Sequence, residues 1–136
     1  VQSVPDLGQD LNGKRILLVD DDLRNTFALS KSLRKQGLDV IIADNGELTL
    51  EKLETEDNID LIIMDIMMPV MDGYETMQRI REQKRFDNMP IIVLSAKAMP
   101  DDREKCIHAG ANDFLTKPVD VDKLLSMIRV WIFQET

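Results

Sequence analysis

The sequence predicts an α/β domain in which five parallel strands form a doubly wound sheet covered by helices on both faces. Five short apolar segments recur along the 136 residues, separated by stretches long enough for a helix. Short unbroken apolar runs are typical of strands buried on both faces, because a strand with one solvent-exposed face alternates apolar and polar residues. Strands that alternate with helices favour a parallel sheet joined by right-handed crossovers.

The predicted strands coincide with the apolar segments. They span residues 16–19, 40–43, 61–64, 91–94 and 114–116. Residues 1–14 contain Pro5, Gly8, Gly13 and polar residues without a sustained period, which indicates a linker or chain end. We therefore expect one domain over residues 15–136, with 43% hydrophobic residues to build its core.

The segments between strands show the three- or four-residue apolar spacing of amphipathic helices. The repeats are Leu29 and Leu33; Leu50 and Leu53; Tyr74, Met77 and Ile80; and Val121, Leu124, Leu125, Ile128 and Ile132. Residues that commonly begin or end helices lie at their borders: Gly37, Asp72 with Gly73, Gly110 and Asp120. The pattern therefore comprises five strand and helix units.

The charge balance and the single cysteine disfavour several classes of protein. Lys and Arg number 17 against 25 Asp and Glu, so the net charge of −8 opposes direct binding to nucleic acid or anionic membranes. Cys106 cannot form an internal disulfide, and no apolar stretch approaches the roughly 20 residues that span a bilayer. The N-terminus lacks a charged segment followed by an apolar one. We expect a reducing, cytoplasmic location.

Carboxylates follow two of the predicted strands. Asp20, Asp21 and Asp22 come after the first strand, and Asp65 comes after the third. The carboxyl ends of parallel strands open at one edge of the sheet, where ligands bind at a topological switch. Acids gathered there repel one another unless a cation lies among them, and oxygen ligands at this density suit Mg²⁺. For any one of these acids, simple capping of the next helix is an open alternative.

Two further polar side chains complete a candidate site for phosphoryl transfer. Ser95 follows the fourth predicted strand and Lys117 follows the fifth. With a metal neutralising charge, a carboxylate can attack phosphorus and form an acyl phosphate. Lys117 and Ser95 can then stabilise the charge that develops on the phosphoryl oxygens.

From Arg15 to about Phe133 the chain resembles the receiver domains of two-component signalling. The shared motifs are Val19-Asp20-Asp21-Asp22, the segment from Met64 to Gly73, Leu94-Ser95-Ala96 and Thr116-Lys117-Pro118. The resemblance implies the flavodoxin-like (βα)5 receiver fold, with strand order 2-1-3-4-5. It also implies a phosphorelay, in which a phosphohistidine of a partner protein gives its phosphoryl group to an aspartate of the receiver.

The resemblance assigns metal and acceptor roles to residues near the acidic turn. It implies that Asp65 is the phosphoacceptor and also touches the metal. Asp21 would ligate Mg²⁺ directly and Asp20 mainly through water, while the backbone carbonyl of Met67 completes the metal shell. Mn²⁺ is expected to substitute for Mg²⁺.

The resemblance also implies a switch. Ser95 and Lys117 match the hydroxyl and the lysine that hold the phosphoryl oxygens, and Phe114 falls at the aromatic switch position. Negative charge on Asp65 would draw Ser95 inward and vacate space into which Phe114 can rotate. The face made by the fourth and fifth units would then change shape, and a homodimer is expected there. The isolated domain is expected to catalyse only its own phosphorylation and dephosphorylation.

The expected partner is a histidine kinase core or a histidine phosphotransfer protein. Residues 22–25 and 124–131 resemble receivers fused at the C-terminus of hybrid sensor histidine kinases. A piece of a larger regulator would look the same, so both origins stay open. The resemblance implies that two positions tune loss of the phosphoryl group, and here they carry Met67 and Lys97. Neither side chain suits activation of water. We therefore expect slow self-dephosphorylation.

Two other functions compete with the phosphorelay. A pseudo-receiver would bind partners without phosphorylation, but it has no need to keep Asp21, Asp65, Ser95 and Lys117 together. A metal-dependent phosphatase also uses an aspartyl nucleophile. Such an enzyme usually has an acid two residues beyond the nucleophile, where this chain has Met67.

Overall fold

Strands and helices alternate along the chain in the computed structural model, which describes residues 11–67, 71–96 and 99–133. The strands are β1 (Arg15–Val19), β2 (Asp39–Ala43), β3 (Leu61–Asp65), β4 (Ile91–Ser95) and β5 (Asp113–Thr116). The helices are α2 (Leu23–Lys35), α3 (Gly46–Thr55), α4 (Gly73–Arg81), α5 (Pro100–Ala109) and α6 (Val121–Ile132), with a short 3₁₀ helix η1 (Lys84–Phe86) before β4. The predicted alternation is therefore confirmed.

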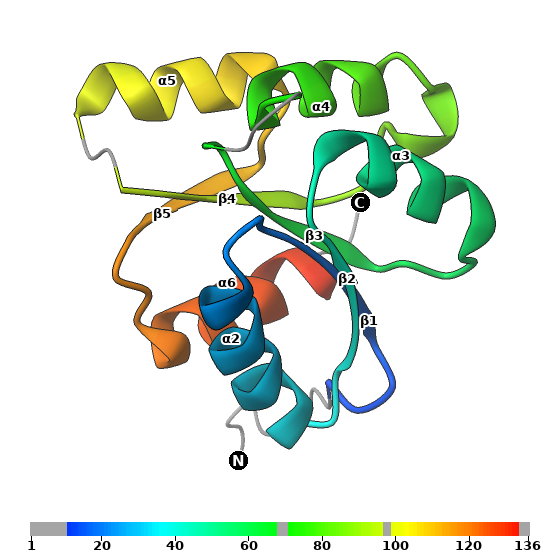
Figure 1. Cartoon of the computed structure of the whole chain (residues 1–136), viewed down its shortest axis with the longest axis vertical. Coiled ribbons are helices and arrows are strands. Elements are labelled where there is room, and N and C mark those ends of the chain that lie inside the picture. Colours follow the sequence, from blue (N-terminus) through cyan, green and yellow to red (C-terminus); the bar gives the residue numbers. More distant parts are fainter. Residues whose placement is uncertain (1–10, 68–70, 97–98, 134–136) are drawn as a thin grey trace.

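The five strands form one parallel sheet in the order β2-β1-β3-β4-β5, as the resemblance implied. Helices α2 and α6 cover one face of the sheet, and α3, α4 and α5 cover the other (Figure 1). The chain reverses its direction of winding at β1, so β1 and β3 are neighbours although β2 lies between them in sequence. Their carboxyl ends form the topological switch at which such sheets bind ligands.

Two hydrophobic clusters, one on each face, hold the layers together. Successive side chains of a strand point to opposite faces, so Ile62 packs toward α3, α4 and α5 while Ile63 packs toward α2 and α6. All residues of β3 and β4 are buried because both strands are central and covered on both sides. These buried central strands carry Asp65 and Ser95 at their carboxyl ends.

The predicted helix borders are confirmed by their capping contacts. The side chains of Asp22, Asp72 and Asp120 accept hydrogen bonds from backbone N–H groups in the first turns of α2, α4 and α6. Gly110 ends α5 with a φ of 125°, a conformation that favours glycine. Asp22 thus serves as a helix cap, which was the alternative left open for each acid of the turn.

Ordered packing extends upstream of Arg15. Leu11 is 3% exposed and belongs to the cluster beneath α2 and α6. The backbone N–H of Lys14 donates to the Leu11 carbonyl at 3.0 Å, and that of Gly13 donates to the Gly37 carbonyl at 2.9 Å. Part of the segment predicted as a linker therefore belongs to the core.

Candidate functional site

The structure brings three carboxylates together at the carboxyl edge of the sheet. Asp20 follows β1 and Asp65 ends β3, and these strands are direct neighbours in parallel register. One ligand oxygen each from Asp20, Asp21 and Asp65 lies within 4.8 Å of the others. Parallel pairing places both strand ends on the same side, so residues far apart in sequence share one pocket.

The two acids at the centre of this pocket are buried. Asp20 and Asp65 are each 4% exposed, whereas Asp21 is exposed. The Asp20 carboxylate accepts a hydrogen bond from the Asp22 backbone N–H at 2.9 Å, and the Asp65 carboxylate accepts one from Met67 at 3.3 Å. These bonds hold the two carboxylates in place without removing their negative charge.

Lys117 places its ammonium between the buried acids. Its Nζ lies 3.6 Å from Asp20 Oδ2 and 3.4 Å from Asp65 Oδ1. The Lys117 backbone N–H donates to the Ser95 carbonyl at 2.8 Å, which ties the end of β5 to the end of β4. Ser95 is itself 2% exposed, so its hydroxyl lies inside this edge of the sheet.

The surroundings of Asp65 oppose its ionisation. Burial raises the pKa of Asp65, and the negative charge of Asp20 raises it further. Lys117 and the Met67 N–H lower the pKa, but they do not cancel the increase. The folded site therefore gains from any additional cation that lies beside this carboxylate.

The donor set fits a hard divalent cation. Three carboxylates face one ammonium, so an excess of two negative charges remains in the pocket. Carboxylate oxygens are the ligands that Mg²⁺ prefers, and exposed Asp21 leaves one side open to water or to another oxygen ligand. The residues present can therefore hold Mg²⁺.

The structure locates the other predicted site residues as follows. Phe114 is 8% exposed and belongs to the cluster covered by α3, α4 and α5. The Met67 side chain is 59% exposed beside the acidic pocket. Lys97 lies outside the described residues.

Gly73 contributes to the site in a way that the sequence reasoning did not anticipate. A Cβ atom at Gly73 would lie 2.9 Å from the Asp65 carbonyl oxygen and 2.9 Å from the Ile66 Cα. The Gly73 N–H donates to the Ile66 carbonyl at 3.0 Å. The first turn of α4 therefore packs directly on the backbone of the phosphoacceptor candidate, which only glycine permits.

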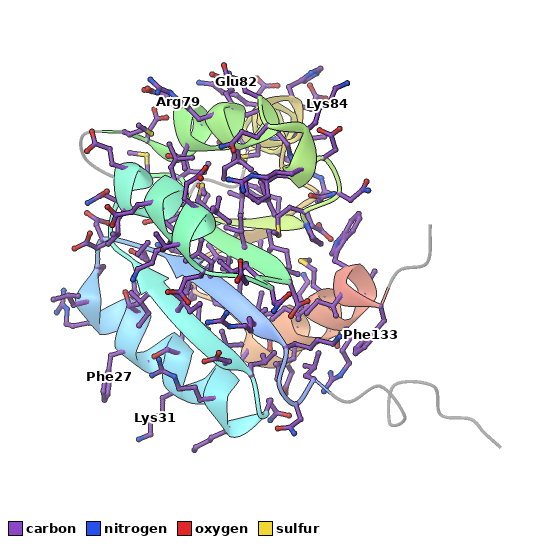
Figure 2. The ribbon with its side chains drawn as sticks, turned by 90° about the vertical axis from the view of Figure 1, so that its right-hand side faces the viewer. Phe27, Lys31, Arg79, Glu82, Lys84 and Phe133 are labelled. Carbon is purple, nitrogen blue, oxygen red and sulfur yellow. The ribbon has the colours of Figure 1, made fainter. Side chains whose placement is uncertain are left out.

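Two exposed apolar side chains on α2 also escaped the sequence reasoning. Leu23 is 71% exposed and Phe27 is 70% exposed, and their spacing of four residues places them on one face of the helix. Figure 2 shows Phe27 extending into solvent from α2. The helical spacing of the apolar residues could have revealed this exposed face, because Phe27 lies on the side of the helix opposite the buried Leu29 and Leu33.

Comparisons with known proteins agree with this geometry. The family model described as Response regulator receiver domain matches residues 16–129. The two-component response regulator ORR11 of Oryza sativa subsp. indica is 34% identical over 116 residues, which cover 83% of this chain and 79% of that protein. The hybrid signal transduction histidine kinase M of Dictyostelium discoideum is 36% identical over 124 residues, covering 88% of this chain and 5% of the kinase.

Solved structures show the same fold. The receiver domain of the sensor histidine kinase PA1611 from Pseudomonas aeruginosa PAO1 superposes with a TM-score of 0.81 at 38% identity, covering 88% of this chain and 98% of that chain. That structure has a magnesium ion coordinated in its active site cleft. The chain spans 51%, 5% and 57% of the length of three of the curated relatives that it matches. In residues 11–67, 71–96 and 99–133 no helix is long and apolar enough to cross a membrane.

Proposed function

The chain belongs to the response regulator receiver family, and we propose that it accepts a phosphoryl group on Asp65 from a phosphohistidine of a partner protein. One observation carries the proposal: the buried Asp65 carboxylate lies 3.4 Å from the Lys117 ammonium and shares a pocket with Asp20 and Asp21. This arrangement unites a nucleophile, a fixed positive charge and oxygen ligands for a metal at one strand edge.

The proposed reaction is a direct transfer. An Asp65 oxygen attacks phosphorus, the bond between phosphorus and the histidine nitrogen breaks, and an acyl phosphate forms while the imidazole leaves. Lys117 and Ser95 stabilise charge on the phosphoryl oxygens. Asp21, Asp20, Asp65 and the Met67 carbonyl would hold Mg²⁺, or Mn²⁺ in its place. The bound ion supplies neutralisation of the acids and of the incoming phosphate.

Phosphorylation with a small donor tests the proposal. The domain is incubated with acetyl phosphate and Mg²⁺, and the intact protein is weighed with and without a chelator. Addition of one phosphoryl group that needs the metal supports the relay. No addition favours the pseudo-receiver, and steady turnover of phosphorylated small molecules favours the phosphatase.

The proposed switch couples Asp65 to Phe114 through Ser95. Phe114 is already 8% exposed, so its ring occupies the interior in this structure. We therefore expect a second state in which the ring is exposed, with phosphorylation favouring one of the two. Phosphorylation should shift the ring resonances of Phe114 in NMR spectra, and this shift should disappear in Ser95→Ala. Unchanged ring resonances in the phosphorylated protein would refute the switch.

The acyl phosphate should be long-lived. Met67 cannot hydrogen-bond an attacking water as an amide can, and its side chain is 59% exposed beside the pocket. We expect Met67→Asn to shorten the half-life of phosphorylated Asp65 several-fold, as measured by the decay of the phosphorylated mass. Met99→Asn is the matched control, because Met99 is also an exposed methionine, at 68%. An unchanged half-life in Met67→Asn would contradict the assignment.

The phosphodonor is proposed to contact α2. Any protein that brings a phosphohistidine to Asp65 must cover the surface around the acidic pocket, and the exposed Leu23 and Phe27 begin directly beyond Asp22. Apolar aromatic side chains are frequent anchors of such contacts. A histidine kinase core or a histidine phosphotransfer protein is the partner that fits this chemistry.

Phe27→Ala should slow transfer from a phosphohistidine protein about tenfold and leave phosphorylation by acetyl phosphate unchanged. The reason is that only the protein donor uses the helix surface. Lys31→Ala is the control, since Lys31 is exposed one turn further along α2 (Figure 2). Equal slowing with both donors would place Phe27 in the chemistry rather than in the contact.

We further propose that the chain is the receiver of a hybrid histidine kinase in a reducing cytoplasm. The matches to a hybrid kinase and to a sensor kinase receiver support this origin.

A homodimer through α5, β5 and α6 also stays a prediction. It is supported by exposed apolar side chains at the start of α5, within α5 and within α6, namely Met99, Ile107 and Val130. Light scattering at increasing concentration should show a rise from the monomer to the dimer mass, and a constant monomer mass would contradict the homodimer.

A further inference from the structure

A pocket of about 510 Å³ lies between α2 and the segment that links β5 to α6. Its walls are mainly apolar and include Leu29, Leu94, Val119 and Val121. Clefts of roughly 300–1,000 Å³ with apolar walls and a few polar groups are typical of small-molecule sites.

The polar groups of the pocket are few and well separated. Asp20 and Lys117 form one end, with their charged atoms 3.6 Å apart. Asn25 and Ser32 line the side formed by α2, and neither side chain has a hydrogen-bond partner among the described residues. A bound molecule would therefore meet a paired donor and acceptor at one end and two uncommitted polar groups along one side.

We propose that this pocket binds a small uncharged molecule with an aromatic or branched apolar body and one head group that both donates and accepts hydrogen bonds. At this end a charged head would be attracted by one member of the Asp20 and Lys117 pair and repelled by the other, so neither sign of charge suits both groups. A neutral carboxamide or phenol instead donates to the carboxylate and accepts from the ammonium. The apolar body packs against Leu29, Leu94 and Val121.

Occupation of the pocket has a consequence that rests on the proposed function. Lys117 lines the pocket and also lies 3.4 Å from Asp65. A molecule that holds the Lys117 ammonium withdraws it from the phosphoryl oxygens, so phosphorylation slows. The binding itself does not depend on phosphorylation and can be measured alone.

Three probes with the same body and different heads test the site: benzamide, benzoate and benzylamine. Each is titrated into the isotope-labelled protein, and the backbone amide resonances of the pocket residues are followed by NMR. Saturable shifts with benzamide, at several-fold lower concentration than with either charged probe, support the proposal. Tighter binding of benzoate or benzylamine would overturn the assigned head group, and no saturable shift with any probe would overturn the site.

A substitution that fills the pocket gives the second readout. Ala28 lines the pocket from the exposed side of α2, so Ala28→Leu should weaken benzamide binding at least tenfold without harming the helix. Lys31→Leu adds similar apolar bulk to α2 at a position that does not line the pocket. This variant should bind benzamide with the affinity of the wild type. Equal benzamide affinity of the two variants would show that benzamide does not bind in this pocket.

The consequence for phosphorylation is measured separately with acetyl phosphate and Mg²⁺. Saturating benzamide should slow phosphorylation of the wild type and leave Ala28→Leu unaffected. Should phosphorylation fail altogether, the NMR titration still decides whether the site exists. If a phosphohistidine protein shifts the pocket amides while no probe does, a protein contact replaces the small-molecule proposal.

Discussion

Asp65→Asn should abolish phosphorylation and at the same time stabilise the metal-free domain. The amide removes the nucleophile, so no phosphoryl group is added from acetyl phosphate. It also removes one of three crowded carboxylates, two of which are buried. Removing a buried negative charge, together with its repulsion from Asp20, should raise the free energy of unfolding by about 1 kcal/mol without Mg²⁺. Mass spectrometry and urea unfolding measure the two effects.

The stability difference should depend on pH in one direction. The pKa of Asp65 is raised above its ordinary value of 3.8, so the stability that protonated Asp65 provides is present below that value. This stability is lost as the pH rises through the folded-state pKa. The gain from Asp65→Asn should therefore be full at neutral pH and vanish in acid. A gain that persists at low pH would point to another cause.

Asp44→Asn is the matched control for this variant. Asp44 is exposed and follows β2 at the same edge of the sheet, but it does not belong to the cluster of Asp20, Asp21 and Asp65. It should be phosphorylated at the wild-type rate and should show no comparable gain in stability. Mg²⁺ should stabilise wild type and Asp44→Asn, and it should stabilise Asp65→Asn less. Phosphorylation of Asp65→Asn would show that another residue is the acceptor.

Lys117→Ala should slow phosphorylation by about 10²–10³-fold, because removal of one preorganised donor to a developing negative charge typically has that effect. The variant should also lose about 1 kcal/mol of stability without metal, since Asp20 and Asp65 lose their shared counter-charge. Its Mg²⁺ affinity should rise, because a competing positive charge has been removed from the pocket.

In Lys117→Ala the phosphorylation rate should fall while the Mg²⁺ affinity rises, and this combination identifies the role of Lys117. Substitution of a metal ligand would lower both the phosphorylation rate and the Mg²⁺ affinity. Substitution of a residue that acts on the phosphoryl group would lower only the rate. Lys123→Ala on the exposed first turn of α6 is the control and should behave as wild type. Lys117→Arg keeps the charge and should recover part of the rate. A fall in Mg²⁺ affinity in Lys117→Ala would contradict this account.

The sequence alone determined the alternation of strands and helices and the edge at which the acids gather. Apolar periodicity is a local property, so the run that ends at Val19 and the run that ends at Met64 identify strands without reference to the rest of the chain. A parallel sheet then requires that Asp20 and Asp65 lie at one edge. The helix caps at Asp72 and Asp120 were readable for the same local reason.

Only the tertiary structure decided the distances and the burial that give these residues their chemistry. The position of the Lys117 ammonium between two carboxylates depends on the pairing of β4 with β5 and on the backbone bond to Ser95. Whether Phe114 lies inside or outside, and whether a pocket remains beside α2, depends on how helices pack on the sheet. Side chains from separate strands meet only after folding, so no local sequence pattern determines the distances between them.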